Sequence, residues 1–188
     1  MINKERWGIA FFVILALLDQ FISLVFPVDF TYSSISFVPH FCFIGCMLML
    51  NNQKTLNRIL YSCLCGLCYG LFFGHNWFLE MLLFTLFGFV LGFFHSYFVK
   101  DNRLLFLGMM ISILLYDCIG FIFGIIMKTV TMAFLQWFIY IELFTLVLHI
   151  LVVLALIYVI TVFLRYSTIK DIRYKKIKKR KMIKLKRK

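Results

Sequence analysis

Charged residues are scarce in this sequence. They make up 15% of its 188 residues, whereas a soluble globular domain usually contains about 25%. Hydrophobic residues reach 63%, and the mean hydropathy is +0.97. Because water cannot solvate such a chain, the composition excludes a soluble domain and predicts an integral membrane protein with lipid around most of its length.

The sequence also lacks the short motifs that mark common enzymes. It contains no HExxH zinc motif, no GxSxG nucleophile elbow and no glycine-rich phosphate loop. The six cysteines lie inside apolar runs, which excludes a disulfide framework and indicates buried thiols. Cys65 and Cys68 have the spacing of half a zinc site, but no second pair follows in a polar segment. We therefore predict no enzyme activity, no cofactor and no metal.

Long apolar runs occupy most of the chain. Phe, Leu and Ile fill all faces of each run, which is typical of spanning helices and not of amphipathic surface helices or barrel strands. The loops between the runs are too short to fold alone. We predict one all-α membrane domain over residues 1–165, a six-transmembrane-helix bundle whose spans are about 7–26, 34–50, 57–73, 77–98, 104–127 and 133–164.

Basic residues near the ends of these runs predict the orientation. Of the 20 Lys and Arg residues, only Lys128 falls in a loop on the side opposite the N-terminus. Cytoplasmic loops carry the excess of Lys and Arg in membrane proteins. We therefore expect a multi-pass protein of the cell membrane with both termini in the cytoplasm.

The last run is longer than a bilayer requires, because a straight helix over residues 133–164 would be about 48 Å long. Two interpretations remain open. Either the helix tilts strongly, or residues 133–142 lie along the outer interface and residues 145–164 cross the membrane. Trp137 and Tyr140 favour the second interpretation, because these residue types prefer the membrane interface.

Several polar residues fall within or at the ends of the apolar runs. An ionised carboxylate facing lipid would cost several kcal/mol, so such groups should face the bundle interior, be protonated or form pairs. They could specify packing through hydrogen bonds, line an outward-facing cavity, or pair with a partner helix. The candidate intramembrane polar residues are Asp19, His40, Glu80, Asp117 and Glu142.

Glycines recur every four residues in the third, fourth and fifth runs. This spacing removes side chains from one stripe of a helix, so that another helix backbone can approach closely. The stripe could serve packing inside the bundle or docking of a partner's helix. The candidate packing glycines are Gly66, Gly70, Gly74, Gly88, Gly92, Gly120 and Gly124.

Residues 166–188 form a polybasic segment that we predict to be a cytoplasmic tail. Basic residues next to a membrane span bind anionic headgroups, each contributing roughly 1 kcal/mol. The tail contains no recognisable nucleic-acid-binding module, so we predict anionic lipids, and no nucleic acid, as its partners. The candidate lipid-contacting residues are Lys175, Lys176, Lys178, Lys179, Arg180 and Lys181.

Residues 59–74 (ILYSCLCGLCYGLFFG) and 86–92 (LFGFVLG) resemble the central region of the rod shape-determining protein MreD. Residues 17–20 (LLDQ) are similar to forms of that family from low-GC Gram-positive bacteria. Length, topology and short loops fit the family over about residues 1–165. Many members carry an acid near the position of Tyr69 and Gly70, where this chain has none.

The resemblance implies a non-enzymatic scaffold of the bacterial cell-wall elongation machinery, which determines cell shape. It implies an MreC-like bitopic membrane protein as a partner, and a RodA-type polymerase and a class B penicillin-binding protein of peptidoglycan synthesis beside it. An alternative is the substrate-binding S component of an energy-coupling-factor vitamin transporter, with Asp19, His40 and Asp117 lining its cavity. Such subunits usually carry an Ala-x-x-x-Ala face in their first helix, whereas here Ala10 and Ala16 are six residues apart.

Overall fold

The computed structural model describes residues 2–27, 36–51, 53–72, 76–98 and 101–186, and all the regular elements among them are helices. Side-chain surroundings are described from residue 8 to residue 169, apart from the gaps between these ranges and residues 96, 164, 167 and 168. The helices are α1 (Ile2–Val25), α2 (Phe41–Leu50), α3 (Thr55–Phe72), α4 (Trp77–Phe93), α5 (His95–Phe98), α6 (Asn102–Ile126), α7 (Phe134–Trp137), the π-helical turn η1 (Phe138–Glu142) and α8 (Leu143–Lys186).

Three helical stretches are long and apolar enough to cross a membrane, namely Gly8–Val25, Asn102–Ile126 and Phe134–Phe163. Phe41–Leu50 and Trp77–Phe93 are shorter apolar helices. The chain is therefore an all-α membrane protein, as its composition predicts. Of these two shorter helices, α2 differs more from its predicted span.

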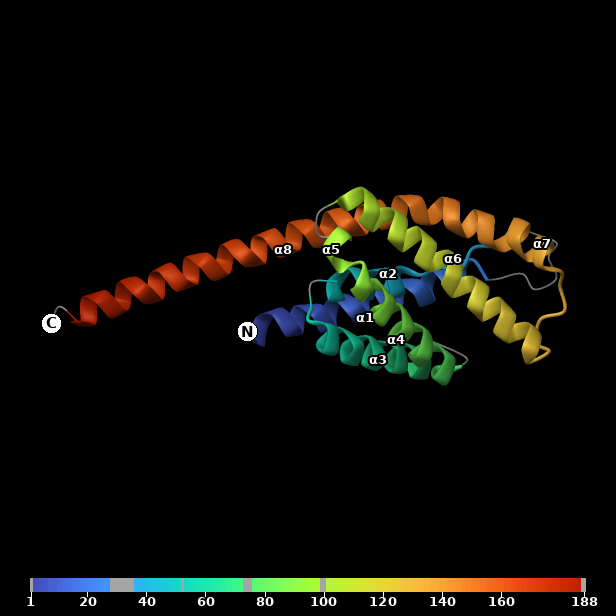
Figure 1. The fold of residues 1–188 in the computed structure, drawn as a ribbon, viewed down its shortest axis with the longest axis horizontal. Helices are drawn as coiled ribbons and strands as arrows, with labels where there is room; N and C mark the ends of the chain where they lie inside the picture. The colour runs from blue at the N-terminus through green and yellow to red at the C-terminus, as the bar shows by residue number, and fades with distance from the viewer. Residues whose placement is uncertain (1, 28–35, 52, 73–75, 99–100, 187–188) are drawn as a thin grey trace.

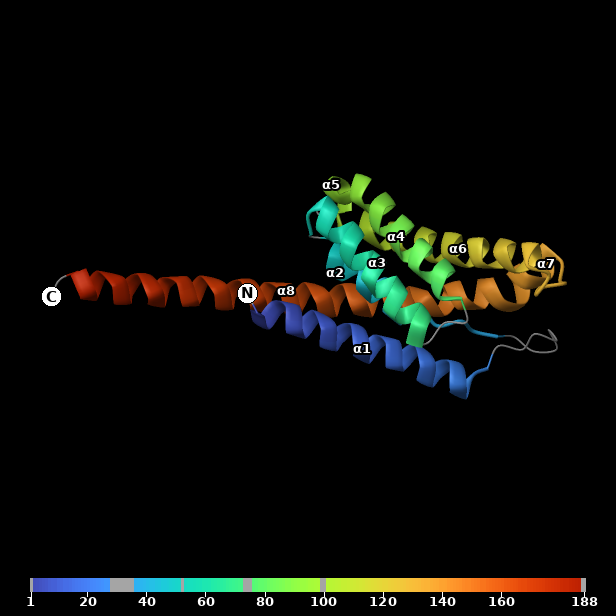
Figure 2. The same ribbon diagram turned by 90° about the horizontal axis from the view of Figure 1, so that it is seen from below.

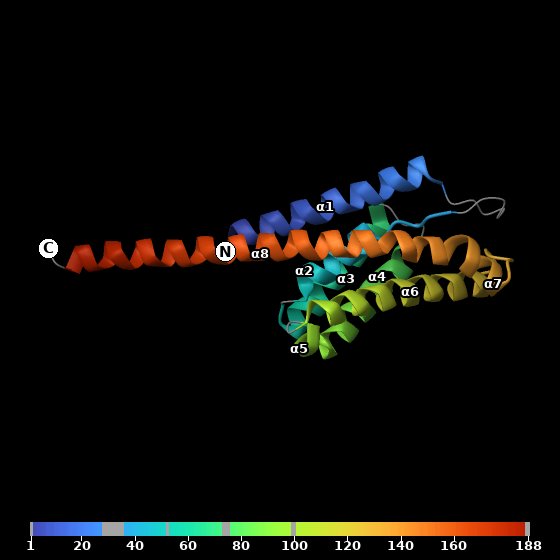
Figure 3. The ribbon, with the colours of Figure 1, turned by 90° about the horizontal axis from the view of Figure 1, so that it is seen from above.

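The helices pack in pairs: α1 against α2, α3 against α4, and α6 against α8 (Figures 1 and 2). The N-terminus lies at the end of the bundle from which α8 leaves it (Figures 1 and 3). The connection from α2 to α3 lies at this same end, while α7 lies at the opposite end. The main core is apolar and includes Ile44, Phe84 and Ile113, each of which is fully buried.

Residues 34–50 were expected to form one helix, but α2 covers only Phe41–Leu50. Residues 36–40 form no helix or strand and run as a stretched-out connection into α2 (Figure 3). Pro39 explains the late start, because proline has no N–H for the helix ladder and its ring disfavours helical geometry at the preceding residue, Val38. A short helix therefore begins inside the bundle, and an extended segment leads into it.

The last run also differs from its expected form. Residues 134–186 stay helical throughout, and the π turn η1 joins α7 to α8. Trp137 packs within the protein: it is 7% exposed and stacks on Phe121 of α6, with ring centroids 4.6 Å apart. Its predicted place at the membrane interface stays a prediction. The predicted tail continues the helix as far as Lys186, so α8 projects well beyond the bundle (Figure 1).

The α3–α4 hairpin is built on the predicted glycine stripe. A Cβ atom added at Gly66 would lie 2.7 Å from the carbonyl oxygen of Glu80, and one added at Gly70 would approach the backbone of Trp77 just as closely. On α4, Gly88 faces Ser62 and Gly92 faces the guanidinium of Arg58. At Gly66 and Gly70 only hydrogen fits, so the two helices meet backbone to backbone there.

Candidate intramembrane polar site

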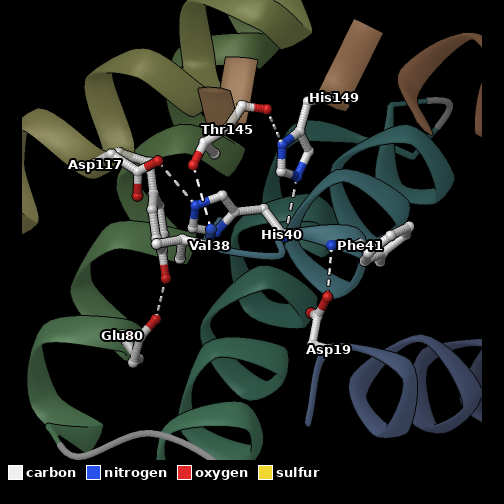
Figure 4. Close-up of polar contacts among 9 residues, drawn as sticks. Asp19, Val38, His40, Phe41, Glu80, Asp117, Thr145 and His149 are labelled. Carbon is white, nitrogen blue, oxygen red and sulfur yellow. Dashed lines mark hydrogen bonds and ion pairs between the residues drawn. The ribbon is translucent and has the colours of Figure 1, made fainter. Parts of the chain in front are cut away.

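Asp19 of α1 caps α2 from a different helix. His40 precedes α2, and its own side chain makes no capping hydrogen bond. Instead, the two carboxyl oxygens of Asp19 accept the backbone N–H groups of Phe41 at 2.8 Å and Cys42 at 2.9 Å. The first N–H groups of a helix have no partner within the helix and favour negative charge. Asp19 is 1% exposed, so it fixes the start of α2 inside the bundle (Figure 4).

The extended segment before α2 bonds to η1 and α8. The N–H of Ser36 donates to the carbonyl oxygen of Tyr140 at 3.1 Å, and that of Val38 donates to Oγ1 of Thr145 at 3.2 Å. The N–H of His40 donates to Nε2 of His149 at 3.1 Å. Alternate residues of an extended chain face the same side. One side of the segment is thus joined to a single neighbouring helix, as non-helical backbone at membrane depth requires.

Both ring nitrogens of His149 are used in this contact. Nδ1 lies 2.7 Å from the carbonyl oxygen of Thr145, which can only accept a hydrogen bond. Nε2 receives the N–H of His40. The hydrogen bonds therefore assign the neutral ring with its proton on Nδ1. His149 and Thr145 are both fully buried, and together they form the part of α8 that receives the extended segment.

His40 and Tyr116 connect the start of α2 to α6 and α4. Nε2 of His40 lies 2.9 Å from Oδ2 of Asp117 on α6. The hydroxyl of Tyr116, one residue earlier on α6, donates to Oε2 of Glu80 on α4. The rings of His40 and Tyr116 meet edge to face, with centroids 5.2 Å apart. These contacts link three elements around one histidine (Figure 4).

Glu142, the last residue of η1, is fully buried. Among the described residues, no N–H, hydroxyl or basic group bonds to its carboxyl oxygens, and its neighbour is the carboxyl group of Asp117 on α6. Two carboxyl groups can bond to each other only when one of them carries a proton. Burying a carboxyl group without a basic partner is costly, and intramembrane acids with this property often mark functional positions. A π-helical turn also occurs frequently at functional sites.

The five predicted polar residues thus gather around the start of α2, and none faces lipid freely. Asp19, His40 and Glu142 are buried, while Glu80 and Asp117 are half-buried. Sequence reasoning missed three members of the cluster: Tyr116, Thr145 and His149. His149 could have been found from the sequence, because a histidine within the apolar run 133–164 indicates an intramembrane polar group. Tyr116 and Thr145 could not, since both residue types are common in spans.

The remaining predicted residues lie elsewhere. Gly120 has nothing within 4 Å of an added Cβ atom, and Gly124 faces Val130 in the turn that ends α6. Neither packs against another helix, so their proposed part in partner docking stays a prediction. Gly74 lies outside the described residues, as do the side chains of Lys175, Lys176, Lys178, Lys179, Arg180 and Lys181.

Arg58 lies in the predicted span 57–73 and is buried near the start of α3 with 3% exposure. One terminal nitrogen donates to the carbonyl oxygen of Asn51 at 3.3 Å, and the other to Oγ1 of Thr55 at 3.5 Å. Gly92 of α4 leaves room for the guanidinium. Arg58 therefore closes the end of the hairpin at which α3 begins.

The cluster is suited to holding a broken helix in place. Its hydrogen bonds join α1, α6, η1 and α8 to the segment that begins α2. Through Tyr116, α6 also holds α4. Among the described residues, no group of three or more His, Cys, Asp or Glu side chains could hold a metal ion. The chemistry that the geometry supports is structural: satisfying backbone groups that lipid cannot.

Residues 3–167 match the profile of a protein family described as rod shape-determining protein MreD. No curated protein and no solved structure matches the chain. The family match confirms the resemblance noted in the sequence and does not support the vitamin-transporter alternative. It covers every residue of the polar cluster. This chain therefore belongs to the MreD family of rod shape-determining membrane proteins.

Proposed function

We propose that this protein is a non-enzymatic membrane scaffold of the bacterial cell-wall elongation machinery. In this role it binds an MreC-like bitopic protein and acts beside a RodA-type polymerase and a class B penicillin-binding protein. The observation that carries the proposal is the family match over residues 3–167, which includes all the apolar helices.

The geometry of the polar cluster supports a scaffold. The paired polar groups bond to the backbone or to each other, and so hold α1, α2, α4, α6 and α8 in one arrangement. A partner that recognises a membrane surface needs such fixed helices, because association of helices in lipid depends on close packing. In a scaffold, the task of the polar cluster is to fix the arrangement of the helices that a partner recognises.

The proposed topology has six membrane crossings and both termini in the cytoplasm. The distribution of Lys and Arg supports it. The N-terminus lies at the same end of the bundle as the point where α8 leaves it (Figure 1). This arrangement supports an even number of crossings. A reporter fused after Lys188 should be active only in the cytoplasm, and one inserted near Lys128 only outside. Activity of the first reporter outside the cell would overturn the topology.

Affinity capture of the full chain in mild detergent tests the scaffold role. We expect a bitopic MreC-like protein to be captured from the native membrane in stoichiometric amount. A chain that ends after residue 169 should capture the same partner, because the bundle and not the basic tail provides the contact. Capture of an ATPase with a tightly held vitamin, or of no bitopic protein, would contradict the proposal.

The tail is proposed to lie along the cytoplasmic leaflet and to bind its anionic lipids. Its charge supports this, as do the isoleucines between the basic residues, which could enter the interface. The peptide 166–188 should bind vesicles that contain phosphatidylglycerol and should be released by salt. Equal binding to vesicles of phosphatidylcholine alone would contradict electrostatic binding.

A further inference from the structure

A groove of about 650 Å³ lies between the first turns of α6 and the second half of the membrane-spanning part of α8. This volume falls within the range of about 300–1,000 Å³ that is usual for ligand sites. The lining residues of the groove come from the start of α6 and from the part of α8 that leaves the bundle. It is separate from the polar cluster around α2, with which it shares no residue.

One end of the groove is polar and positively charged. Asn102 and Arg103 line it from the first turn of α6, and Thr161 and Arg165 line it from two successive turns of α8. Both arginines are exposed. Asp101 accepts the backbone N–H of Arg103 at 2.8 Å but does not line the groove. The described lining residues include no acid, so two positive charges meet at this end.

The rest of the groove is apolar. Phe106 and Leu107 line it from α6, and Leu154, Ile157 and Tyr158 line it from α8. Ile157 is 8% exposed and belongs to the core, whereas Leu154 and Tyr158 are open to the membrane. From Leu154 to Arg165 the helix rises about 16 Å. This length matches half of a hydrocarbon core roughly 30 Å thick, so the groove extends over one leaflet.

We infer that this groove binds one anionic phospholipid of the adjacent leaflet, with its phosphate between Arg103 and Arg165 and an acyl chain along Leu107 and Leu154. Guanidinium groups match phosphate oxygens in charge and geometry. Basic pockets between membrane helices are known sites for anionic headgroups. A partner helix in the same groove would bring apolar side chains against two arginines for which no described residue forms an ion pair, which is unfavourable in a membrane.

Photo-cross-linking in nanodiscs tests this inference on the full chain. The nanodiscs consist of phosphatidylcholine with a small fraction of phosphatidylglycerol that carries a photoactivatable group on its acyl chain. We expect cross-links to concentrate on the peptides that contain Leu107 and Leu154. A photoactivatable phosphatidylcholine should label these peptides several-fold less.

Two variants separate a bound lipid from general charge attraction. Arg103→Gln combined with Arg165→Gln should lower phosphatidylglycerol cross-linking in the groove about tenfold. The matched control, Lys175→Gln with Lys176→Gln, removes the same charge from the tail and should leave cross-linking in the groove unchanged. A third variant, Leu154→Trp, fills the apolar part without changing charge and should lower cross-linking as well. Unchanged melting temperatures of all variants would show that the bundle is intact.

Three outcomes would overturn the inference. Equal labelling by the two lipids would show ordinary lipid contact without selection for charge. Equal losses in the groove and tail variants would show attraction to net charge alone. Loss of lipid cross-links on addition of a stoichiometric membrane partner, with new protein cross-links at Leu107, would show that a helix occupies the groove.

Discussion

In the α3–α4 hairpin the two helices touch through glycines, whereas around α2 the helices are joined by hydrogen bonds to an extended segment. Gly66 and Gly70 lie against the backbone of α4, so dispersion contacts hold the hairpin. The start of α2 is instead fixed by Asp19, Thr145 and His149, which belong to α1 and α8. The hairpin connects neighbours in the chain, and the second region connects its two ends.

The comparison shows two ways of satisfying the same physical requirement. Lipid offers no hydrogen bonds, so every backbone N–H at membrane depth needs a partner inside the protein. The hairpin meets this requirement within each helix and gains stability from close approach. The segment before α2 cannot form these bonds within a helix, because Pro39 interrupts the helix. Polar side chains from other helices accept its N–H groups instead. The predictions below probe this difference.

Asp19→Leu should have the largest effect. The substitution leaves the N–H groups of Phe41 and Cys42 without acceptors in a buried place, which should lower the free energy of unfolding by about 3 kcal/mol. Thermal unfolding in detergent measures the change. Maleimide labelling of Cys42, which is fully buried, should rise as the start of α2 loosens.

Asp19→Asn serves as the matched control for that variant. Its amide keeps one acceptor oxygen, so it should lose less than half of the stability lost in Asp19→Leu. Equal losses in the two variants would show that hydrogen bonding to α2 is not the role of Asp19.

Gly66→Ala should lower the free energy of unfolding by about 2 kcal/mol, because the added methyl meets the backbone of Glu80 and Met81 and must push α4 away. Gly120→Ala provides the control within another helix, since nothing lies within 4 Å of its added carbon. It should raise the free energy of unfolding by about 0.5 kcal/mol through helix propensity. Similar effects at the two positions would contradict the packing role of the stripe.

Thr145→Val should lower the free energy of unfolding by about 1 kcal/mol, because the N–H of Val38 loses its acceptor while the shape of the side chain is kept. Thr85→Val is the control. Its hydroxyl donates only to the carbonyl oxygen of Met81 on the same helix, so its loss should change stability by a few tenths of a kcal/mol at most. An equal loss of stability in Thr85→Val and Thr145→Val would show that the hydrogen bond from Val38 to Thr145 contributes no more than one within a helix.

Replacing the six tail residues Lys175, Lys176, Lys178, Lys179, Arg180 and Lys181 by Gln should have the smallest effect on the bundle. They follow the membrane-spanning part of α8, so the free energy of unfolding should change by less than about 0.5 kcal/mol. Thermal unfolding of the purified variant measures this. A large loss of stability would mean that the tail packs on the bundle.

Much of the fold could be predicted because it depends on local patterns. Apolar runs identified the long helices, and four-residue spacing identified the glycines at the α3–α4 contact. Asp19, His40 and Asp117 were recognised because an ionisable group is rare and costly in lipid. Pro39 was visible too, but its neighbours are apolar, and hydropathy alone does not distinguish an extended segment from a helix.

The sequence by itself determined that lipid surrounds this chain, that its long apolar runs are helical, and that it belongs to the MreD family. Each of these follows from composition or from patterns along the chain. Only the tertiary structure decided which polar groups meet. Val38 and Thr145 are 107 residues apart, and His40 and Asp117 are 77 apart. Contacts over such separations depend on how the helices pack, because the local sequence around each partner is equally apolar.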